Sequence, residues 1–465
     1  MSITSNLFLT GLLPLTIILT LLFRNNIKRQ NIFLIIINTV FLLFSGIGGV
    51  VLLALTCVVD YLFVRLIQKD HTSKKATALF VIALILNIAP LLFYKYTGFF
   101  LSSVNSAFGL ETAIPQLTVP VGISFYTFQA ISLLSDVKTG KIKYQPKFFE
   151  VYFYLTFFTT ITSGPIVRFN DIREKYHDRA IVASDVNVGL TRFVIGLSKK
   201  TLLANNLATF ADKTFTLGES HGALSIVGFW MGSIAFTLQL YMDFSGYSDM
   251  VIGIAKVLGF HIPENFDYPY TAKTIQEFWR KWHISLSRWF RDYVYIPLGG
   301  NRVSKARHIF NLLVVWLLTG FWHGANWTFI FWGLLYFVLL VFEKYCKKAS
   351  DFFSRHFIGH IYTLFFVNLL WVFFRASSIQ NAFYYIGGMF GVNSIANPVE
   401  LSLLHTLPFL VLCFIGCFPI KKCVEKYQGK TAFEITKAIV LCALLVLCIV
   451  SISGSAFTPF IYGKF

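Results

Sequence analysis

Two histidines with aromatic neighbours are the residues of this sequence best suited to chemistry. The first, His323, lies in Thr319-Gly-Phe-Trp-His-Gly-Ala-Asn-Trp327, near the middle of a stretch over 309–342 that contains no charged residue. An ionisable side chain within such a stretch is a functional candidate by default. A buried histidine that stays neutral also has the lone pair that a general base requires. The other interpretation of His323 is a core histidine whose hydrogen bonds are satisfied locally.

The second histidine, His283, lies in a polar and aromatic segment over 277–293. If this segment forms one helix, two opposite faces result: a basic face of Arg280, Lys281, Arg288 and Arg291, and an aromatic face of Phe278, Trp282, Leu286, Trp289, Phe290 and Tyr293. Such a helix is expected to lie in the cytoplasmic interface of a membrane. Its basic face could also receive the phosphates of an anionic cofactor. His283 lies at the edge of the aromatic face, where a histidine that hydrogen-bonds locally is the simpler interpretation.

Three further polar side chains interrupt apolar runs. Gln129 follows Phe125-Tyr-Thr-Phe128, and Asp243 and Asp249 lie in the run Tyr241-Met-Asp-Phe-Ser-Gly-Tyr-Ser-Asp249. A buried carboxylate can orient a histidine, pair with a cation or take part in a proton path. The spacing of the two aspartates does not bring them to one helical face, so a paired acid–base dyad is not predicted. The seven cysteines lie singly or within apolar runs, and neither a metal site nor a disulfide framework is predicted.

The composition places these residues in a membrane protein. Of the 465 residues, 56% are hydrophobic and only 13% are charged, which excludes a soluble enzyme and a disordered chain. The net charge is +18, and the basic residues lie in short loops between apolar runs, as the positive-inside rule describes. We therefore interpret the charge as topology and contact with anionic membrane lipids, and not as nucleic-acid binding.

The apolar runs predict an all-α polytopic bundle of roughly ten to twelve membrane segments, since a spanning helix needs about 20 residues. The run over 32–68 contains Gly46 near its middle and is too long for one pass, so two segments are expected. As one helix, 309–342 would reach about 51 Å, too long for one pass and short for two. A bent or re-entrant path is therefore predicted there. No repeat or linker divides the chain, and a single domain over 1–465 is expected.

Loop charges predict the orientation of both ends. The first run, over 7–23, ends at basic residues and has no preceding Lys or Arg, which favours an uncleaved signal anchor with the amino terminus outside. Four lysines precede the last run, over 435–457, and a fifth lies at its start: Lys421, Lys422, Lys426, Lys430 and Lys437. The carboxyl terminus is therefore also expected outside.

Several motifs occur in a fixed order along the chain. They are Gly164-Pro-Ile-Val-Arg168, Tyr241-Met-Asp-Phe-Ser-Gly-Tyr247, Phe278-Trp-Arg-Lys-Trp-His-Ile-Ser-Leu-Ser-Arg-Trp289, Ile296-Pro-Leu-Gly-Gly-Asn-Arg302 and Phe321-Trp-His-Gly-Ala-Asn-Trp327. Together they resemble the membrane-bound O-acyltransferases, above all the branch that contains the membrane subunit of bacterial alginate O-acetyltransferase. The motifs cover much of 120–335.

The resemblance implies a membrane helix bundle with re-entrant and interfacial helices around a central tunnel. His323 matches the family's signature histidine, and His283 matches its second active-site position. The implied reaction is acyl transfer from a cytoplasmic thioester, here acetyl-CoA, toward an acceptor outside. His323 would act as base on the accepting hydroxyl. His283, helped by Asn326, would orient or protonate the reacting groups.

The resemblance also implies a location and partners. The location is the bacterial cytoplasmic membrane, and the partner is a separate extracytoplasmic acetyltransferase that completes transfer to a polysaccharide. Alginate, peptidoglycan, cellulose and other exopolysaccharides all remain open as acceptors. The tail Ser455-Ala-Phe-Thr-Pro-Phe-Ile-Tyr-Gly-Lys-Phe465 is similar to carboxyl-terminal motifs of this acyl-export group. Tyr462 is thus a candidate acyl carrier at the outer mouth, with an aromatic interfacial anchor as the alternative.

Two other functions remain open at this point. A D-alanyl exporter for teichoic acids belongs to the same superfamily and ranks second, because the segment over 296–302 looks more like the acetylating branch. A secondary transporter could use Asp243, Asp249 and His323 as a proton relay, although no inverted repeat is visible. A purely structural scaffold would leave these buried polar residues unexplained.

Overall fold

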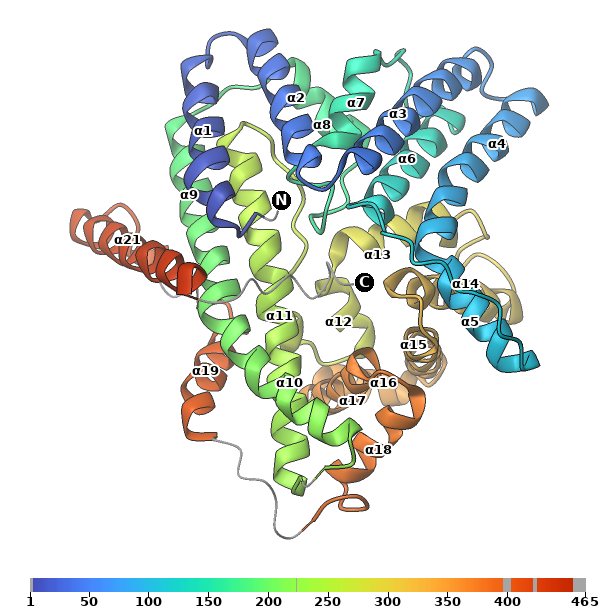
Figure 1. Cartoon of the computed structure of the whole chain (residues 1–465), viewed down its shortest axis with the longest axis vertical. Coiled ribbons are helices and arrows are strands. Elements are labelled where there is room, and N and C mark those ends of the chain that lie inside the picture. The colour runs from blue at the N-terminus through green and yellow to red at the C-terminus, as the bar shows by residue number, and fades with distance from the viewer. Residues whose placement is uncertain (1–2, 223, 396–402, 421–424, 455–465) are drawn as a thin grey trace. The chain divides into compact units, whose positions relative to one another are not determined.

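The computed structural model describes residues 3–222, 224–395, 403–420 and 425–454, and all its regular elements are helices (Figure 1). The prediction of an all-α protein is thereby confirmed for the part of the chain described. The chain forms two compact units: one comprises Met1–Phe193 and Met250–Pro263, and the other comprises Val194–Asp249 and Glu264–Phe465. The single enzyme domain expected over 1–465 stays a prediction.

The first unit consists mainly of α-helices joined by turns and loops. They are α1 (Leu13–Leu22), α2 (Ile27–Leu43), α3 (Ile47–Gln68), α4 (Lys74–Leu91), α5 (Thr97–Phe108), α6 (Ile123–Lys138), α7 (Phe148–Thr156), α8 (Phe169–His177) and most of α9 (Ala183–Ser198). The predicted division of 32–68 is confirmed, since α2 and α3 are separate helices. Gly46 lies between them with φ 111°, a conformation that glycine adopts without steric cost.

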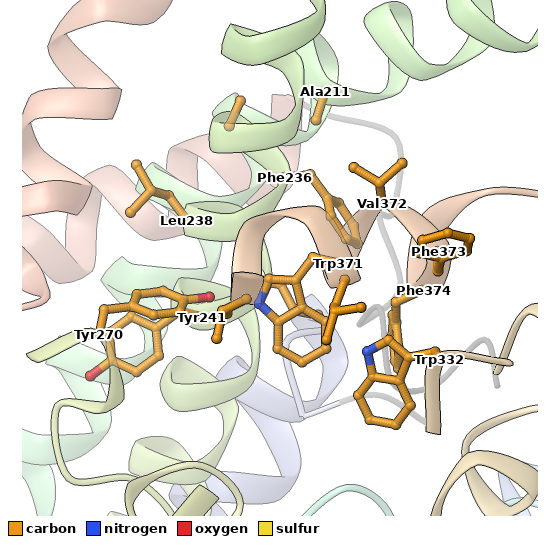
Figure 2. Packing of buried hydrophobic residues seen from close by; sticks show 14 of the residues in the cluster. Ala211, Phe236, Leu238, Tyr241, Tyr270, Trp332, Trp371, Val372, Phe373 and Phe374 are labelled. Carbon is orange, nitrogen blue, oxygen red and sulfur yellow. The ribbon is translucent and has the colours of Figure 1, made fainter. Parts of the chain in front are cut away.

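The second unit contains both histidine motifs. Its helices are α10 (Asn205–Glu219), most of α11 (Ile226–Val257), α12 (Ile275–Lys281), α13 (Ile284–Phe290), α14 (Lys305–His323), α15 (Trp327–Tyr345), α16 (Lys347–Arg355), α17 (Ile358–Arg375), α18 (Ile379–Met389), α19 (Leu403–Gly416) and α21 (Thr431–Gly454). Aromatic rings fill its core, as Figure 2 shows. The indoles of Trp332 and Trp371 stack with centroids 5.8 Å apart, and Trp282 lies 5.0 Å from Trp371.

Five helical stretches in the described part of the chain are long and apolar enough to cross a membrane: α3, the continuous stretch Lys74–Phe108, α15, α17 and α21. They make the protein a multi-pass membrane protein. The stretches Phe8–Leu22 and His405–Gly416 are apolar but shorter. The predicted count of roughly ten to twelve segments also included apolar stretches outside these five. That count, the central tunnel and the orientation of the ends stay predictions.

The stretch over 309–342 forms a helical hairpin of α14 and α15. A Cβ atom on Gly320 would lie 2.4 Å from the carbonyl oxygen of Phe329, and one on Gly333 would lie 2.4 Å from that of Trp316. The two helices therefore approach so closely that only glycine fits at these two positions, as is common between membrane helices. The prediction of a bent path is confirmed, and the turn follows directly after His323.

Candidate active site

His283 lies at a break between two short helices. The single helix predicted over 277–293 is wrong, because α12 ends at Lys281, α13 begins at Ile284, and a π-helical turn covers Arg291–Tyr295. His283 has φ 44° and ψ 54°. This left-handed conformation costs about 1–2 kcal/mol for a residue with a Cβ atom. Hydrogen bonds from outside the segment hold the break: Asp267 N–H donates to Lys281 O, and Ile284 N–H donates to Asn265 O, each at 3.0 Å.

The aromatic and basic faces expected for this segment have different surroundings. The aromatic side chains Phe278, Trp282, Trp289 and Phe290 are buried, and the first two belong to the aromatic core of the second unit. The cationic side chains lie outside this core. Arg280, Arg288 and Arg291 are exposed, and Lys281 is partly exposed. Lys281 forms an ion pair with Glu277 at 2.8 Å, and Arg291 forms one with Asp292 at 2.7 Å.

A polar side chain from another segment holds the imidazole of His283. The Nδ1 atom lies 3.0 Å from Oδ1 of Asn265, and the edge of the ring packs on Phe244 at a centroid distance of 4.8 Å. His283 is 0% exposed. Burial disfavours the charged imidazolium and lowers the pKa of His283 to about 3. His283 is therefore neutral at pH 7.

His323 is the last residue of α14 and is enclosed by aromatic rings. It is 2% exposed, and its imidazole lies 4.9 Å from Trp322, 5.1 Å from Trp332 and 5.3 Å from Phe374, measured between ring centroids. Figure 2 shows Trp332 and Phe374 on neighbouring helical elements of this core. The next residue, Gly324, packs against the ring of Phe329 so closely that a Cβ atom would lie 2.1 Å from it. The turn after His323 therefore has no room for a side chain at position 324.

One indole lies against both histidines. Trp322 is 6.0 Å from His283 and 4.9 Å from His323, again between ring centroids. The interruption at His283 and the end of α14 at His323 therefore place their imidazoles around a single ring, although α13 and the rest of α14 lie between them in the sequence. A pair of buried imidazoles can orient a hydroxyl group and accept its proton, which is the chemistry of acyl transfer to an alcohol.

A comparison with known protein families matches residues 135–386, which include both histidines, to the membrane-bound O-acyltransferases. This chain belongs to that family. It is 32% identical to a peptidoglycan O-acetyltransferase of Helicobacter pylori, over 95% of this chain and 93% of the relative. It is also 32% identical to a probable alginate O-acetylase of Pseudomonas putida, over 100% of both chains. A teichoic acid D-alanyltransferase of Bacillus subtilis is 29% identical over 73% of this chain and 88% of the relative.

Membership makes the protein an O-acyltransferase, and the remaining predicted site residues can be placed in it. Asn326 is the N-cap of α15: its Oδ1 accepts from Thr328 N–H at 3.0 Å, and its Nδ2 donates to Ser377 O at 3.1 Å. Through these bonds, Asn326 holds the turn that follows His323. Gln129 lies in the other unit of the acyltransferase, where its Nε2 donates to Thr160 Oγ1 at 3.3 Å. Tyr462 lies outside the described residues.

Two carboxylates of this O-acyltransferase, the buried Asp243 and the partly buried Asp249, are paired with lysines. Asp243 Oδ1 lies 2.5 Å from Lys200 Nζ, and Asp249 Oδ2 lies 2.7 Å from Lys199 Nζ. Of the three roles that the sequence left open for these aspartates, the structure shows the pairing with a cation. Elsewhere within the described ranges, no group of three His, Cys, Asp or Glu side chains is arranged to hold a metal ion.

Sequence reasoning missed Asn265, which is 0% exposed and contacts His283. It lies in the connection between α11 and α12, within Ile262-Pro-Glu-Asn-Phe-Asp267. No local pattern links this residue to a histidine 18 positions further along. Its burial in a polar loop is visible only when the segments are assembled.

Proposed function

We propose that this O-acyltransferase moves an acetyl group from acetyl-CoA, on the cytoplasmic side of the bacterial cytoplasmic membrane, toward a polysaccharide outside. Two full-length similarities support this proposal, since these relatives are named for O-acetylation of peptidoglycan and of alginate. The observation that carries it is the pair of buried histidines around Trp322. Both chain termini would lie outside, as the loop charges favour.

In the proposed reaction, the oxygen of the accepting hydroxyl attacks the thioester carbonyl carbon. His323 takes the hydroxyl proton as the new C–O bond forms. The C–S bond then breaks, and the departing thiolate of coenzyme A takes the proton from His323, so that one ester and one free thiol result. His283 is neutral at pH 7, which favours orientation of the hydroxyl over protonation of a leaving group.

The donor's phosphates would meet the basic side of α12 and α13. Arg280, Arg288 and Arg291 are exposed there, while the aromatic side of the same segment is buried. Guanidinium groups bind phosphate through paired charge-assisted hydrogen bonds. This arrangement would hold a charged donor at one side while its acyl group reaches the histidines.

A separate extracytoplasmic acetyltransferase would complete transfer to the polysaccharide and choose it. Tyr462 would carry or position the acetyl group for this handover. Labelled acetyl-CoA and peptide mapping test that role. Absence of label from the tail of active protein would exclude a covalent relay, and retained activity in Tyr462→Phe would do so independently.

The central test is release of free coenzyme A by purified protein in lipid nanodiscs, with acetyl-CoA and a mannuronate oligosaccharide as hydroxyl acceptor. Wild type should release thiol, and His323→Ala should be at least about 100-fold slower, the usual contribution of a general base. His356→Ala is the matched control, because this histidine is exposed in the turn after α16. Equal rates in wild type and His323→Ala would exclude the catalytic role.

A D-alanyl thioester donor is the second candidate, because a teichoic acid D-alanyltransferase is among the relatives. Adding a D-alanyl carrier protein to the same assay separates the two donors. Competition with acetyl-CoA, followed by appearance of a D-alanyl ester, would favour the exporter. No competition would favour acetyl transfer.

A further inference from the structure

Asn265 is a buried asparagine whose side chain contacts the imidazole of His283 and three polar groups of two serines in the second unit. Its Oδ1 lies 3.0 Å from His283 Nδ1 and accepts from Ser285 Oγ at 2.8 Å and from Ser285 N–H at 3.4 Å. Its Nδ2 donates to Ser248 Oγ at 3.2 Å. With 0% of Asn265 exposed, water does not replace any of these partners.

The partners determine which way the amide faces. A backbone N–H can only donate, so the atom of Asn265 that faces Ser285 N–H must be the oxygen. His283 Nδ1 points to that same oxygen. Because an amide oxygen only accepts, Nδ1 of His283 must carry the hydrogen. In a neutral imidazole the lone pair then lies on Nε2.

We propose that Asn265 is the positioning residue of the second histidine and holds His283 as its Nδ1–H tautomer, with the Nε2 lone pair as the reacting atom. In the reaction proposed above, on which this role rests, Nε2 accepts a hydrogen bond from a second hydroxyl of the acceptor and so turns the attacking hydroxyl toward the thioester. His283 then acts through a hydrogen bond, while His323 takes the proton. The other tautomer would present an N–H donor at Nε2 and could not orient the hydroxyl in this way.

The main chain of Asn265 contributes to the same arrangement. Its carbonyl oxygen accepts from Ile284 N–H at 3.0 Å, next to the left-handed backbone of His283. A non-glycine residue keeps such a conformation only where several contacts determine it together. Asn265 therefore holds both the ring and the backbone of His283, which a residue that merely filled space would not do.

The first test measures the tautomer directly and needs no activity. Solid-state NMR of protein labelled with ¹⁵N-histidine in lipid bilayers at pH 7 should show a neutral imidazole protonated at Nδ1, and this signal should be missing in His283→Gln. A signal protonated at Nε2, or at both nitrogens, would overturn the proposal. Because this readout does not depend on turnover, it separates failure of the positioning role from failure of the proposed acetyl transfer.

The second test compares two substitutions of Asn265 in the coenzyme A release assay. Asn265→Ala should lower kcat at least about tenfold at every pH and leave the KM for acetyl-CoA unchanged, because the donor site is intact. Asn265→Asp keeps an acceptor for Nδ1–H and adds a negative charge, which favours the imidazolium. It should keep most of the plateau rate but move the acid limb of the pH profile upward by about one unit or more.

Asn206→Ala and Asn206→Asp are the matched controls, since this asparagine is exposed on α10 of the same unit. Neither should change kcat or the pH profile. An Asn265→Asp variant with the wild-type pH profile would overturn the proposal. If Asn265→Ala fails to fold, the tautomer of the wild-type protein and the profile of Asn265→Asp still decide the question.

Discussion

The two histidines of this O-acyltransferase are both placed at helix ends, but by different physical means. His323 follows a tight helix crossing and is enclosed by the rings of Trp322, Trp332 and Phe374. His283 has a left-handed backbone and a hydrogen bond to Asn265. Aromatic rings enclose the first imidazole, whereas an amide oxygen from another segment orients the second.

This difference has consequences for each imidazole. A ring enclosed by packing keeps its place as long as the volumes around it are unchanged. A ring held by an amide oxygen has a selected tautomer and is sensitive to charge and to pH. Substitutions that change volume should therefore damage the His323 position most, and changes in protonation should damage the His283 position most.

Extra volume at the helix crossing should have the largest effect. In Gly320→Ala, the new Cβ atom would lie 2.4 Å from the backbone oxygen of Phe329, so α14 and α15 would have to separate. We expect the free energy of unfolding to fall by about 3 kcal/mol and the enzyme activity to be lost as well. Thermal unfolding in detergent measures the stability. Gly48→Ala is the control, because nothing lies within 4 Å of its Cβ position and no loss is expected. Equal stability of the two variants would contradict a close crossing.

The second-largest effect is expected from acidification, which should lower stability through His283. The pKa of His283 is about 3 in the folded protein, against 6.5 for an ordinary histidine. Below pH 6.5 the unfolded chain binds a proton that the folded protein does not, so stability falls as the pH falls toward 3. At about 1.4 kcal/mol per pH unit, this loss reaches about 2 kcal/mol between pH 6.5 and pH 5.

The measurement is thermal unfolding of wild type and His283→Gln at these two pH values. Wild type should lose about 2 kcal/mol more than His283→Gln, which has no group to protonate at this position. His356→Gln, in which an exposed histidine is removed, should behave like wild type. Parallel losses in all three proteins would mean that His283 is not buried in its neutral form.

Loss of the cap after His323 should have a smaller effect. Asn326→Ala removes the acceptor for Thr328 N–H, which typically costs about 1 kcal/mol, and it also frees the turn from Ser377. We expect activity to fall several-fold. Asn26→Ala is a matched control, because Asn26 caps α2 in the other unit through Arg29 N–H at 3.0 Å. It should lose similar stability without losing activity. A full rate in Asn326→Ala would show that the turn keeps its shape by packing alone.

The smallest effect is expected on the exposed basic side of α12. Arg280→Gln should raise the KM for acetyl-CoA by about two- to fivefold, with kcat unchanged, because an exposed charge contact contributes little in water. Added salt should reduce the difference between wild type and the variant. Arg355→Gln removes an exposed arginine at the end of α16 and should leave the KM unchanged. An equal rise in both variants would indicate a general charge effect and not a donor contact.

Much of this architecture could be predicted from local sequence. The length of 309–342 and its glycines indicated a bent path, and the structure has the α14–α15 hairpin there. The segment over 277–293 was different, because its helical periodicity is regular and contains no glycine or proline. The break at His283 was therefore missed. It arises because the backbone of residues 265–267 hydrogen-bonds to the segment and offsets the cost of the left-handed residue.

A helical membrane protein, the resemblance to the O-acyltransferases and the candidate histidines at 283 and 323 could all be inferred from the sequence alone. Apolar length, loop charge and motif order are properties of contiguous residues, so they can be read along the chain. The packing of the helices was needed to show that the imidazole of His283 lies against Trp322, that Asn265 holds this imidazole, and that Asp243 pairs with Lys200. These contacts join side chains far apart in sequence, and their geometry exists only after the helices have packed.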